Sequence, residues 1–170
     1  MNADELRSVQ APLKHQYRQT PDAALVTLRA QGRLGEGVSC KIETGKALVV
    51  AGLHPATGGT GLSACAGDML LEALVACAGA TLNAVATALG IELRDALLQA
   101  EGDLDFRGTL GVSKEVPVGF QGIRLKFTLD TDASDEQLAT LLRLTERYCV
   151  VYQTLVRPPA MTVTRQTVEA

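Results

Sequence analysis

Two cysteines are the residues of this chain whose surroundings could support chemistry. Cys77 lies in the middle of the most apolar stretch, 68–89, and Cys149 follows 72 residues later, just after an amphipathic helical pattern. A thiol among small apolar side chains is normally an inert part of a core. It becomes reactive only if its thiolate is stabilised and a second thiol can reach it. The rest of the sequence must decide between these two interpretations.

The other candidate groups offer no rival chemistry. Cys40 and Cys65 have no partner spacing and are expected to be structural, although Cys65 lies near a predicted helix start, where thiols become more acidic. His15 and His54 are too few and too scattered for a zinc site. The glycine-rich segment 58–61 lacks the Gly-Lys-Ser/Thr ending of a phosphate loop and is expected to be flexible. The sequence therefore predicts neither a metal nor a cofactor.

Composition and charge argue against several classes of partner. The net charge of −3 and the isoelectric point of about 5.4 give no electrostatic reason to expect nucleic acid or an anionic membrane. An aromatic content of 4% argues against a base-stacking surface. Residues 1–20 are charged and lack the apolar region of a signal peptide. We therefore expect a cytoplasmic protein in a reducing environment, with its cysteines as thiols.

The elements that must position the two thiols alternate between strands and helices, which predicts an α+β fold. Hydrophobic patterning, turn residues and caps place them as follows: a strand over 24–34, a hairpin of 38–43 and 46–51, a loop over 54–61, a long helix over about 66–89 ended by Gly90, strands over 92–106 and 122–130, a helix opened by a capping box at Ser134, and a final strand over 161–168.

The N-terminal residues form a separate helical pattern. Residues 1–20 predict two helical pieces, with Pro12 at the first turn of the second, where proline is tolerated. We therefore expect a helical extension over 1–22. The remaining length fits one domain over 23–170.

The composition of the apolar stretch 68–89 also indicates how this segment is buried. The segment is long enough to span a bilayer, but it contains Asp68, Glu72 and Asn83 and is dominated by alanine, so it predicts a buried helix instead. A stripe of small residues recurs along it at spacings of three and four, which would let another helix approach closely. Its members are Ala73, Cys77, Ala80, Thr81, Ala84 and Ala88. A helix that is apolar on nearly all sides must be buried on nearly all sides. Burial against a copy of itself in a two-fold dimer would satisfy this requirement.

At these residues the chain resembles a known family. The run from Asp68 through Leu-Leu to Ala-Cys77 is similar to the central helix of the OsmC/Ohr family of osmotically inducible and organic hydroperoxide resistance proteins. Glu146-Arg-Tyr-Cys149 resembles the second cysteine region of that family. The order of elements also matches, over roughly residues 24–168. The resemblance implies an intertwined homodimer, with antiparallel sheets from both chains around two long central helices, and thiol-dependent reduction of organic hydroperoxides.

The resemblance also implies a role for four residues. Cys77 would attack the peroxide and become a sulfenic acid, and Cys149 would resolve it to a disulfide that an external dithiol, such as a lipoyl group, reduces. Arg33 would hold Cys77 as a thiolate and orient the peroxide, because a guanidinium keeps its charge and offers several donors. Asp68 would orient that arginine by a bidentate pair. Arg29 is a competitor for the arginine.

Departures from the family pattern leave alternatives open. Val150 stands where the family often has proline, and Asp68 stands where it usually has glutamate. Asp68 equally fits a helix N-terminal acid. It lies nine residues before Cys77, about 180° around a regular helix. Either Asp68 lies in an entry turn before the helix, or acid and thiol meet across the dimer. The alternative function is the same fold without significant peroxidase activity, binding an apolar small molecule at the dimer interface.

Overall fold

The computed structural model describes residues 3–34, 40–42 and 51–167. Its helices and strands are, in chain order: α1 (Ala3–Gln19), η1 (Pro21–Ala24), β1 (Leu25–Leu34), β2 (Cys40–Ile42), β3 (Ala51–Gly52), η2 (Pro55–Thr57), β4 (Ala64–Cys65), α2 (Ala66–Leu89), β5 (Asp95–Asp105), α3 (Phe106–Thr109), β6 (Gly122–Asp130), α4 (Asp135–Tyr148) and α5 (Val150–Val156). The predicted α+β class is confirmed.

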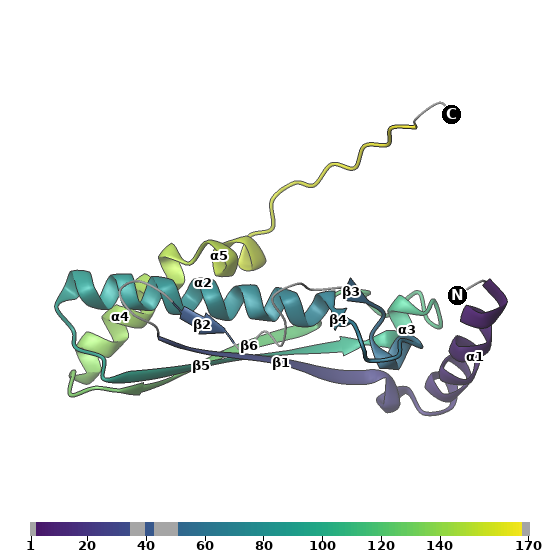
Figure 1. The fold of residues 1–170 in the computed structure, drawn as a ribbon, viewed down its shortest axis with the longest axis horizontal. Helices are drawn as coiled ribbons and strands as arrows, with labels where there is room; N and C mark the ends of the chain where they lie inside the picture. Colours follow the sequence, from purple (N-terminus) through teal and green to yellow (C-terminus); the bar gives the residue numbers. More distant parts are fainter. Residues whose placement is uncertain (1–2, 35–39, 43–50, 168–170) are drawn as a thin grey trace.

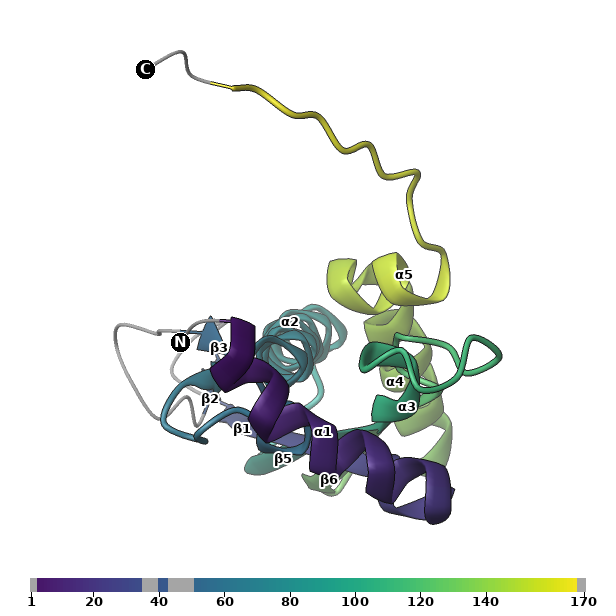
Figure 2. The same ribbon diagram turned by 90° about the vertical axis from the view of Figure 1, so that its right-hand side faces the viewer.

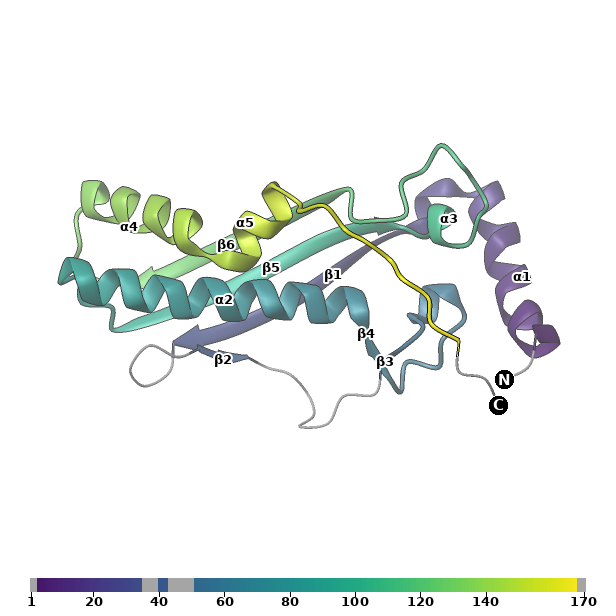
Figure 3. The same ribbon diagram turned by 90° about the horizontal axis from the view of Figure 1, so that it is seen from above.

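Over the described residues, the main sheet has four strands and is antiparallel. Its strand order is β2-β1-β5-β6, and each neighbouring pair is antiparallel, while β3 and β4 form a separate parallel pair. Helix α2 runs along one face of the sheet, and α4 and α5 lie beside it on the same face (Figures 1 and 3). Helix α1 crosses the end of these layers (Figure 2). No helix of the described residues covers the other face of the sheet.

The core lies between α2 and the sheet. Ala96, Leu98 and Ala100 alternate along β5 and are buried, because successive side chains of a strand point to opposite faces. Leu71 and Leu82 of α2 are fully buried above them. Each such leucine contributes about 1.5–3 kcal/mol by its burial. The apolar stretch is therefore a core helix, as its composition predicted.

The predicted bounds of the long helix are confirmed. It ends at Gly90, which adopts a φ of 68°, and whose N–H donates to the carbonyls of Ala86 and Thr87. This left-handed conformation costs glycine little and satisfies carbonyls at the helix end. The strands predicted over 24–34, 92–106 and 122–130 are also present, with ends shifted by a few residues.

Two predictions at the chain ends are wrong. The N-terminal residues form one helix, α1, with Pro12 inside it, and not two pieces. One proline removes one backbone donor, and Tyr17 still fixes the helix end by donating to the Ala56 carbonyl at 2.7 Å. The final strand over 161–168 is absent from its described part, where Met161 and Val163 are 88% and 95% exposed. A strand requires a hydrogen-bonded neighbour, and the described part of this chain offers none to this segment, which leaves the body after α5 (Figure 1).

The predicted hairpin lies largely outside the described residues. Its described parts are β2, which pairs with β1, and β3, which pairs with β4. The division into an extension over 1–22 and a domain over 23–170 stays a prediction.

The predicted capping box of α4 is present, and we expect it to contribute to the stability of the fold. The Ser134 hydroxyl accepts the N–H of Gln137 at 3.3 Å, and the Gln137 side chain accepts the N–H of Ser134 at 2.9 Å. We expect Ser134→Ala to lower the free energy of unfolding by about 1 kcal/mol, measured by urea denaturation. Ser134→Asp keeps an acceptor and should retain most of the stability. An equal loss in both variants would contradict the capping role.

Candidate active site

The structure brings Cys77 and Cys149 together. Cys77 lies in the middle of α2, and Cys149 occupies the joint between α4 and α5, where the backbone is extended with φ −71° and ψ 109°. The Cys149 thiol donates a hydrogen bond to the Cys77 sulfur. Both cysteines are free thiols; Cys149 is 1% exposed and Cys77 is partly buried. This geometry meets the first requirement for a redox pair, a second thiol within reach.

The spacing of buried residues along α4 explains this meeting. Leu141, Thr145 and Cys149 follow one another at intervals of four residues and are all buried. Residues four apart lie on the same face of a helix, so the face that packs on α2 carries Cys149 at its end. The Thr145 hydroxyl donates to the Leu141 carbonyl at 2.8 Å, so this buried hydroxyl has a hydrogen-bond partner within α4.

The surroundings of Cys77 favour its thiolate. Burial alone would raise the pKa of this thiol, but four donors outweigh burial and lower the pKa of Cys77 below its ordinary value. In decreasing order they are the Val151 N–H, the Cys149 thiol, the Val150 N–H and the Thr81 hydroxyl. Each of these donors stabilises the charged form and not the neutral thiol. More of Cys77 is therefore nucleophilic at neutral pH than of an ordinary cysteine.

The surroundings of Cys149 have the opposite effect. Burial is the largest cause that raises the pKa of Cys149 to about 11. The Tyr152 N–H lowers it by less than burial raises it, the hydrogen bond to Cys77 and the negative charge of its thiolate raise it again, and the Val151 N–H has the smallest lowering effect. The Tyr152 N–H lies 3.4 Å from the Cys149 sulfur. The pair is thus asymmetric: Cys77 ionises first, and Cys149 stays protonated as a donor.

Arg33 does not reach Cys77 within one chain. It pairs with Leu97 across β1 and β5, and so lies on the sheet face opposite to the buried positions that contact α2. Its guanidinium forms an exposed ion pair with Asp95, with 2.6 Å between Nη1 and Oδ2. None of the described groups that lower the pKa of Cys77 is an arginine. The side chain of Arg29 lies outside the described part of the structure.

Asp68 does not reach Cys77 within one chain either. It lies in the first turn of α2, inside the regular helix. Nine residues of α-helix place it about 13 Å along the axis and on the opposite side from Cys77. Burial raises the pKa of Asp68, and the nearby His54 opposes this with a smaller effect. Of the two arrangements left open by the sequence, an entry turn before the helix is therefore excluded.

The described side chains of the remaining His and Cys residues lie apart from the Cys77–Cys149 pair. The His54 ring stacks on Phe106 with 5.0 Å between centroids, and its Nδ1 accepts the Ala56 N–H at 3.0 Å. Cys65 is a partly buried free thiol before α2. Over the described ranges, no three His, Cys, Asp or Glu side chains lie close enough to bind a metal ion.

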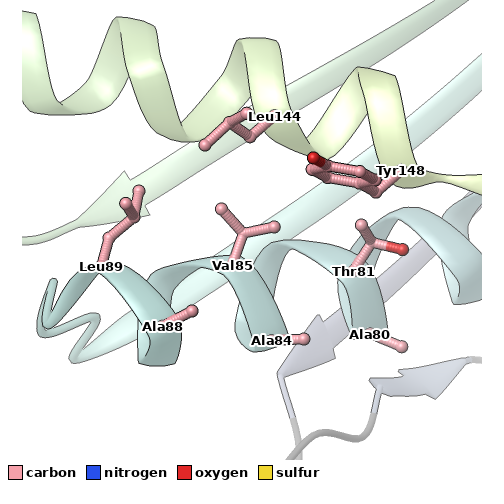
Figure 4. Close-up of a pocket in the computed structure, with 8 residues that line it drawn as sticks. All are labelled: Ala80, Thr81, Ala84, Val85, Ala88, Leu89, Leu144 and Tyr148. Carbon is pink, nitrogen blue, oxygen red and sulfur yellow. The ribbon is translucent and has the colours of Figure 1, made fainter.

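Two apolar hollows flank Cys77. A groove of about 510 Å³ begins one turn after it, and a pocket of about 330 Å³ begins one turn before it. The groove lies between α2 and α4 (Figure 4) and is lined by Ala80, Thr81, Ala84, Val85, Ala88, Leu89, Leu144 and Tyr148. The pocket is lined by Leu74, Phe120, Gly122, Ile123, Leu125, Tyr152, Leu155 and Val156. Each is lined mainly by apolar side chains, and neither lining includes Cys77 itself.

Sequence reasoning missed three donors at Cys77. The N–H groups of Val150 and Val151 belong to the main chain and leave no mark in residue type. The available signal was that a residue with a free N–H, and not proline, follows Cys149. Thr81 was recognised only as a small residue of the helix stripe.

The comparisons with known proteins agree with this fold. The OsmC-like protein family model matches residues 59–164, more than half of the chain. No curated protein matches the chain. The crystal structure of an OsmC-like hydroperoxide resistance protein from Jannaschia sp. CCS1 is 14% identical, with a TM-score of 0.59 over 86% of this chain and 97% of that one. That of an OsmC-like protein from Mycoplasma pneumoniae is 18% identical, with a TM-score of 0.55 over 79% and 86%. At these identities the likeness concerns the fold.

The Val150 N–H can be removed with little structural change. Val150 is the first residue of α5, where proline is tolerated, and the extended Cys149 suits a residue before proline. We expect Val150→Pro to raise the pKa of Cys77 and to slow its alkylation at pH 6 about tenfold, because a hydrogen bond to a charged group contributes about 1.5–3 kcal/mol. The measurement is the rate of iodoacetamide labelling of the Cys77 peptide against pH.

The matched control is Val150→Ala, which keeps the N–H. Val150 is 71% exposed, so shortening its side chain should change little. If the proline and alanine variants gave the same pH profile, the Val150 N–H would have no part in stabilising the thiolate.

Proposed function

Because the chain belongs to the OsmC-like protein family, we propose that it is a thiol-dependent peroxidase that reduces organic hydroperoxides. The observation that supports this is the pair of adjacent cysteines with opposite shifts in pKa, lowered at Cys77 and raised at Cys149. A peroxidase of this kind needs one thiolate that attacks the peroxide and one protonated thiol that reacts only with the sulfenic acid formed. An inert core thiol needs neither a lowered pKa nor a second thiol beside it.

In the first step the Cys77 thiolate attacks the distal oxygen of the hydroperoxide. An S–O bond forms, the O–O bond breaks, and the departing alkoxide takes a proton to become an alcohol. Cys77 becomes a sulfenic acid, and the peroxide is reduced by two electrons. The Val150 and Val151 N–H groups, which hold the thiolate, keep the sulfur in place for this attack.

In the second step the Cys149 sulfur attacks the sulfur of the sulfenic acid. An S–S bond forms, the S–O bond breaks, and the hydroxide leaves as water with the proton of the Cys149 thiol. Because its pKa is raised to about 11, Cys149 is not oxidised first. An external dithiol then reduces the disulfide by thiol exchange and is itself oxidised to a disulfide.

The surroundings of the thiol favour an organic substrate. The groove and the pocket beside Cys77 are lined mainly by apolar side chains. An alkyl or aryl group would bury apolar surface there, at about 25 cal/mol per Å², whereas hydrogen peroxide has no such surface. We therefore expect cumene hydroperoxide to react faster than hydrogen peroxide.

Arg33 and Asp68 belong to this proposal as contributions from a second copy of the chain. Neither reaches Cys77 within one chain, and the stripe of small residues on α2 remains partly uncovered, with Ala73, Ala84 and Ala88 exposed. A two-fold dimer through this stripe would cover it and, because Ala84 and Ala88 also line the groove, would make the groove a cavity between the two chains. It would also bring groups of the second chain to the face of α2 that carries Cys77.

A second candidate function is the binding of an apolar small molecule without peroxidase activity. The observation that favours it is the apolar groove of about 510 Å³. The two functions differ at Cys77: a binding protein needs no acidic thiol there. A pKa of Cys77 at or above that of an ordinary cysteine, with no accelerated reaction with peroxide, would favour binding.

The redox pair makes a direct prediction. One equivalent of cumene hydroperoxide should join Cys77 to Cys149 and leave Cys65 reduced, as peptide mapping can establish. In Cys149→Ser the sulfenic acid has no resolving thiol, so Cys77 should proceed to sulfinic acid under excess peroxide. Cys65→Ser is the matched control and should form the same disulfide as the wild type. A disulfide to Cys65, or full turnover by Cys77→Ser, would contradict the assignment.

The placement of Arg33 is tested by mixing inactive chains. Arg33→Gln and Cys77→Ser should each lose most peroxidase activity as homodimers. If Arg33 serves the Cys77 of the other chain, co-expressing the two variants creates one intact site in each mixed dimer, and activity should partly return. Arg124→Gln, which alters another exposed arginine of the sheet, should keep full activity. No recovery in isolated mixed dimers would contradict a contribution from the second chain.

A further inference from the structure

Thr81 is the polar residue of the groove that stands beside the reactive sulfur. It lies one turn after Cys77 on α2, and its hydroxyl donates to the Cys77 carbonyl at 2.7 Å. The same hydroxyl is within hydrogen-bonding reach of the Cys77 sulfur. Of the eight residues that line the groove, only Thr81 and Tyr148 carry a polar side-chain atom. Figure 4 shows both at one end of the groove, with Val85 and Leu144 in the middle and Leu89 toward the other end.

The hydroxyl has two acceptors and one hydrogen. In an α-helix the Cys77 carbonyl already accepts the Thr81 N–H, so it does not depend on the hydroxyl. A thiolate is a charged acceptor and forms a stronger hydrogen bond than a neutral carbonyl. Rotation about a single C–O bond is enough to redirect the hydrogen from one acceptor to the other. The carbonyl bond therefore fits the protonated state of Cys77, and a bond to sulfur fits the ionised state.

We propose that Thr81 is a positioning residue for Cys77, whose hydroxyl turns from the Cys77 carbonyl to the Cys77 sulfur when that sulfur ionises. The redirected hydrogen bond fixes the thiolate at the mouth of the groove, where the O–O bond of a hydroperoxide with its apolar group in the groove would lie. The part concerning the peroxide rests on the proposed function. The part concerning the thiolate does not.

A second threonine of the same helix separates this role from a purely structural one. The Thr87 hydroxyl donates to the Asn83 carbonyl at 2.8 Å, which is the same bond four residues back along the helix. Thr87 is exposed and lies ten residues, about 15 Å, beyond Cys77. Replacing either threonine by valine removes the same kind of helix bond. Only the Thr81 hydroxyl has the sulfur as a second acceptor.

The experiment compares Thr81→Val and Thr81→Ser with Thr87→Val by alkylation of Cys77 against pH in fully reduced protein. We expect Thr81→Val to shift the profile to higher pH and to slow labelling of the Cys77 peptide at pH 6 about fivefold, because a hydrogen bond to a charged acceptor is lost. Thr81→Ser keeps a hydroxyl and should restore the wild-type profile. Thr87→Val should leave it unchanged. At a pH above the pKa of Cys77 in both proteins, the labelling rates of the wild type and of Thr81→Val should converge.

Several results would overturn the proposal. They are a Thr81→Val profile equal to that of Thr87→Val, a deficit that persists at high pH, or no rescue by Thr81→Ser. Thr81→Ala provides a second variant without the hydroxyl, should valine disturb folding as judged by circular dichroism. Alkylation needs no peroxide, so the result stands even if the protein reduces none. A protein with peroxidase activity but no Thr81 effect would overturn this inference alone.

Discussion

The packing of the joint between α4 and α5 onto α2 is the constraint on which the candidate site depends. Leu141, Thr145 and Cys149 are buried as one face at the C-terminal part of α4. Because exposing this face would cost free energy, the end of α4 stays packed against α2. Because α4 ends at Cys149 and the backbone turns there into α5, the first N–H groups of α5 come to lie at the Cys77 sulfur. Ordinary core packing thus positions both the second thiol and the donors to the first.

The same packing makes the two thiols unequal. Burial penalises a charge on Cys149 by more than the Tyr152 and Val151 N–H groups offset, whereas Cys77 is less buried and collects donors from two helices. The hydrogen bond between them reinforces the difference, since it stabilises the thiolate of one and requires the proton of the other. No arginine is needed in the described part of the chain to reach this state. A separate cation beside Cys77 would lower its pKa further and would also orient the peroxide.

The sequence predicted what local signals determine. The bounds of α2 follow from its apolar run and from Gly90, and the start of α4 follows from the Ser134 capping box. It failed where a distant partner decides: the pattern over 161–168 favours a strand, but a strand needs a neighbour that the described chain does not offer it. At the site, Cys77 and Cys149 were found from residue type, because thiols are rare and distinctive. The main-chain donors were not, since any residue except proline supplies them.

The placement of Arg33 separates two parts of the chemistry. Its ion pair with Asp95 holds it on the sheet face away from α2, whereas the donors to Cys77 come from α2, α5 and the joint before α5. If the arginine acts from a second copy, an isolated chain would keep the donors that lower the pKa of Cys77 and lose the guanidinium that orients the peroxide. Thiol acidity would then belong to the fold of one chain, and peroxide orientation to the assembly. Burial of the small-residue stripe of α2 would link the two, because a contact that covers Ala84 and Ala88 would also bring the second chain to the face of α2 that carries Cys77.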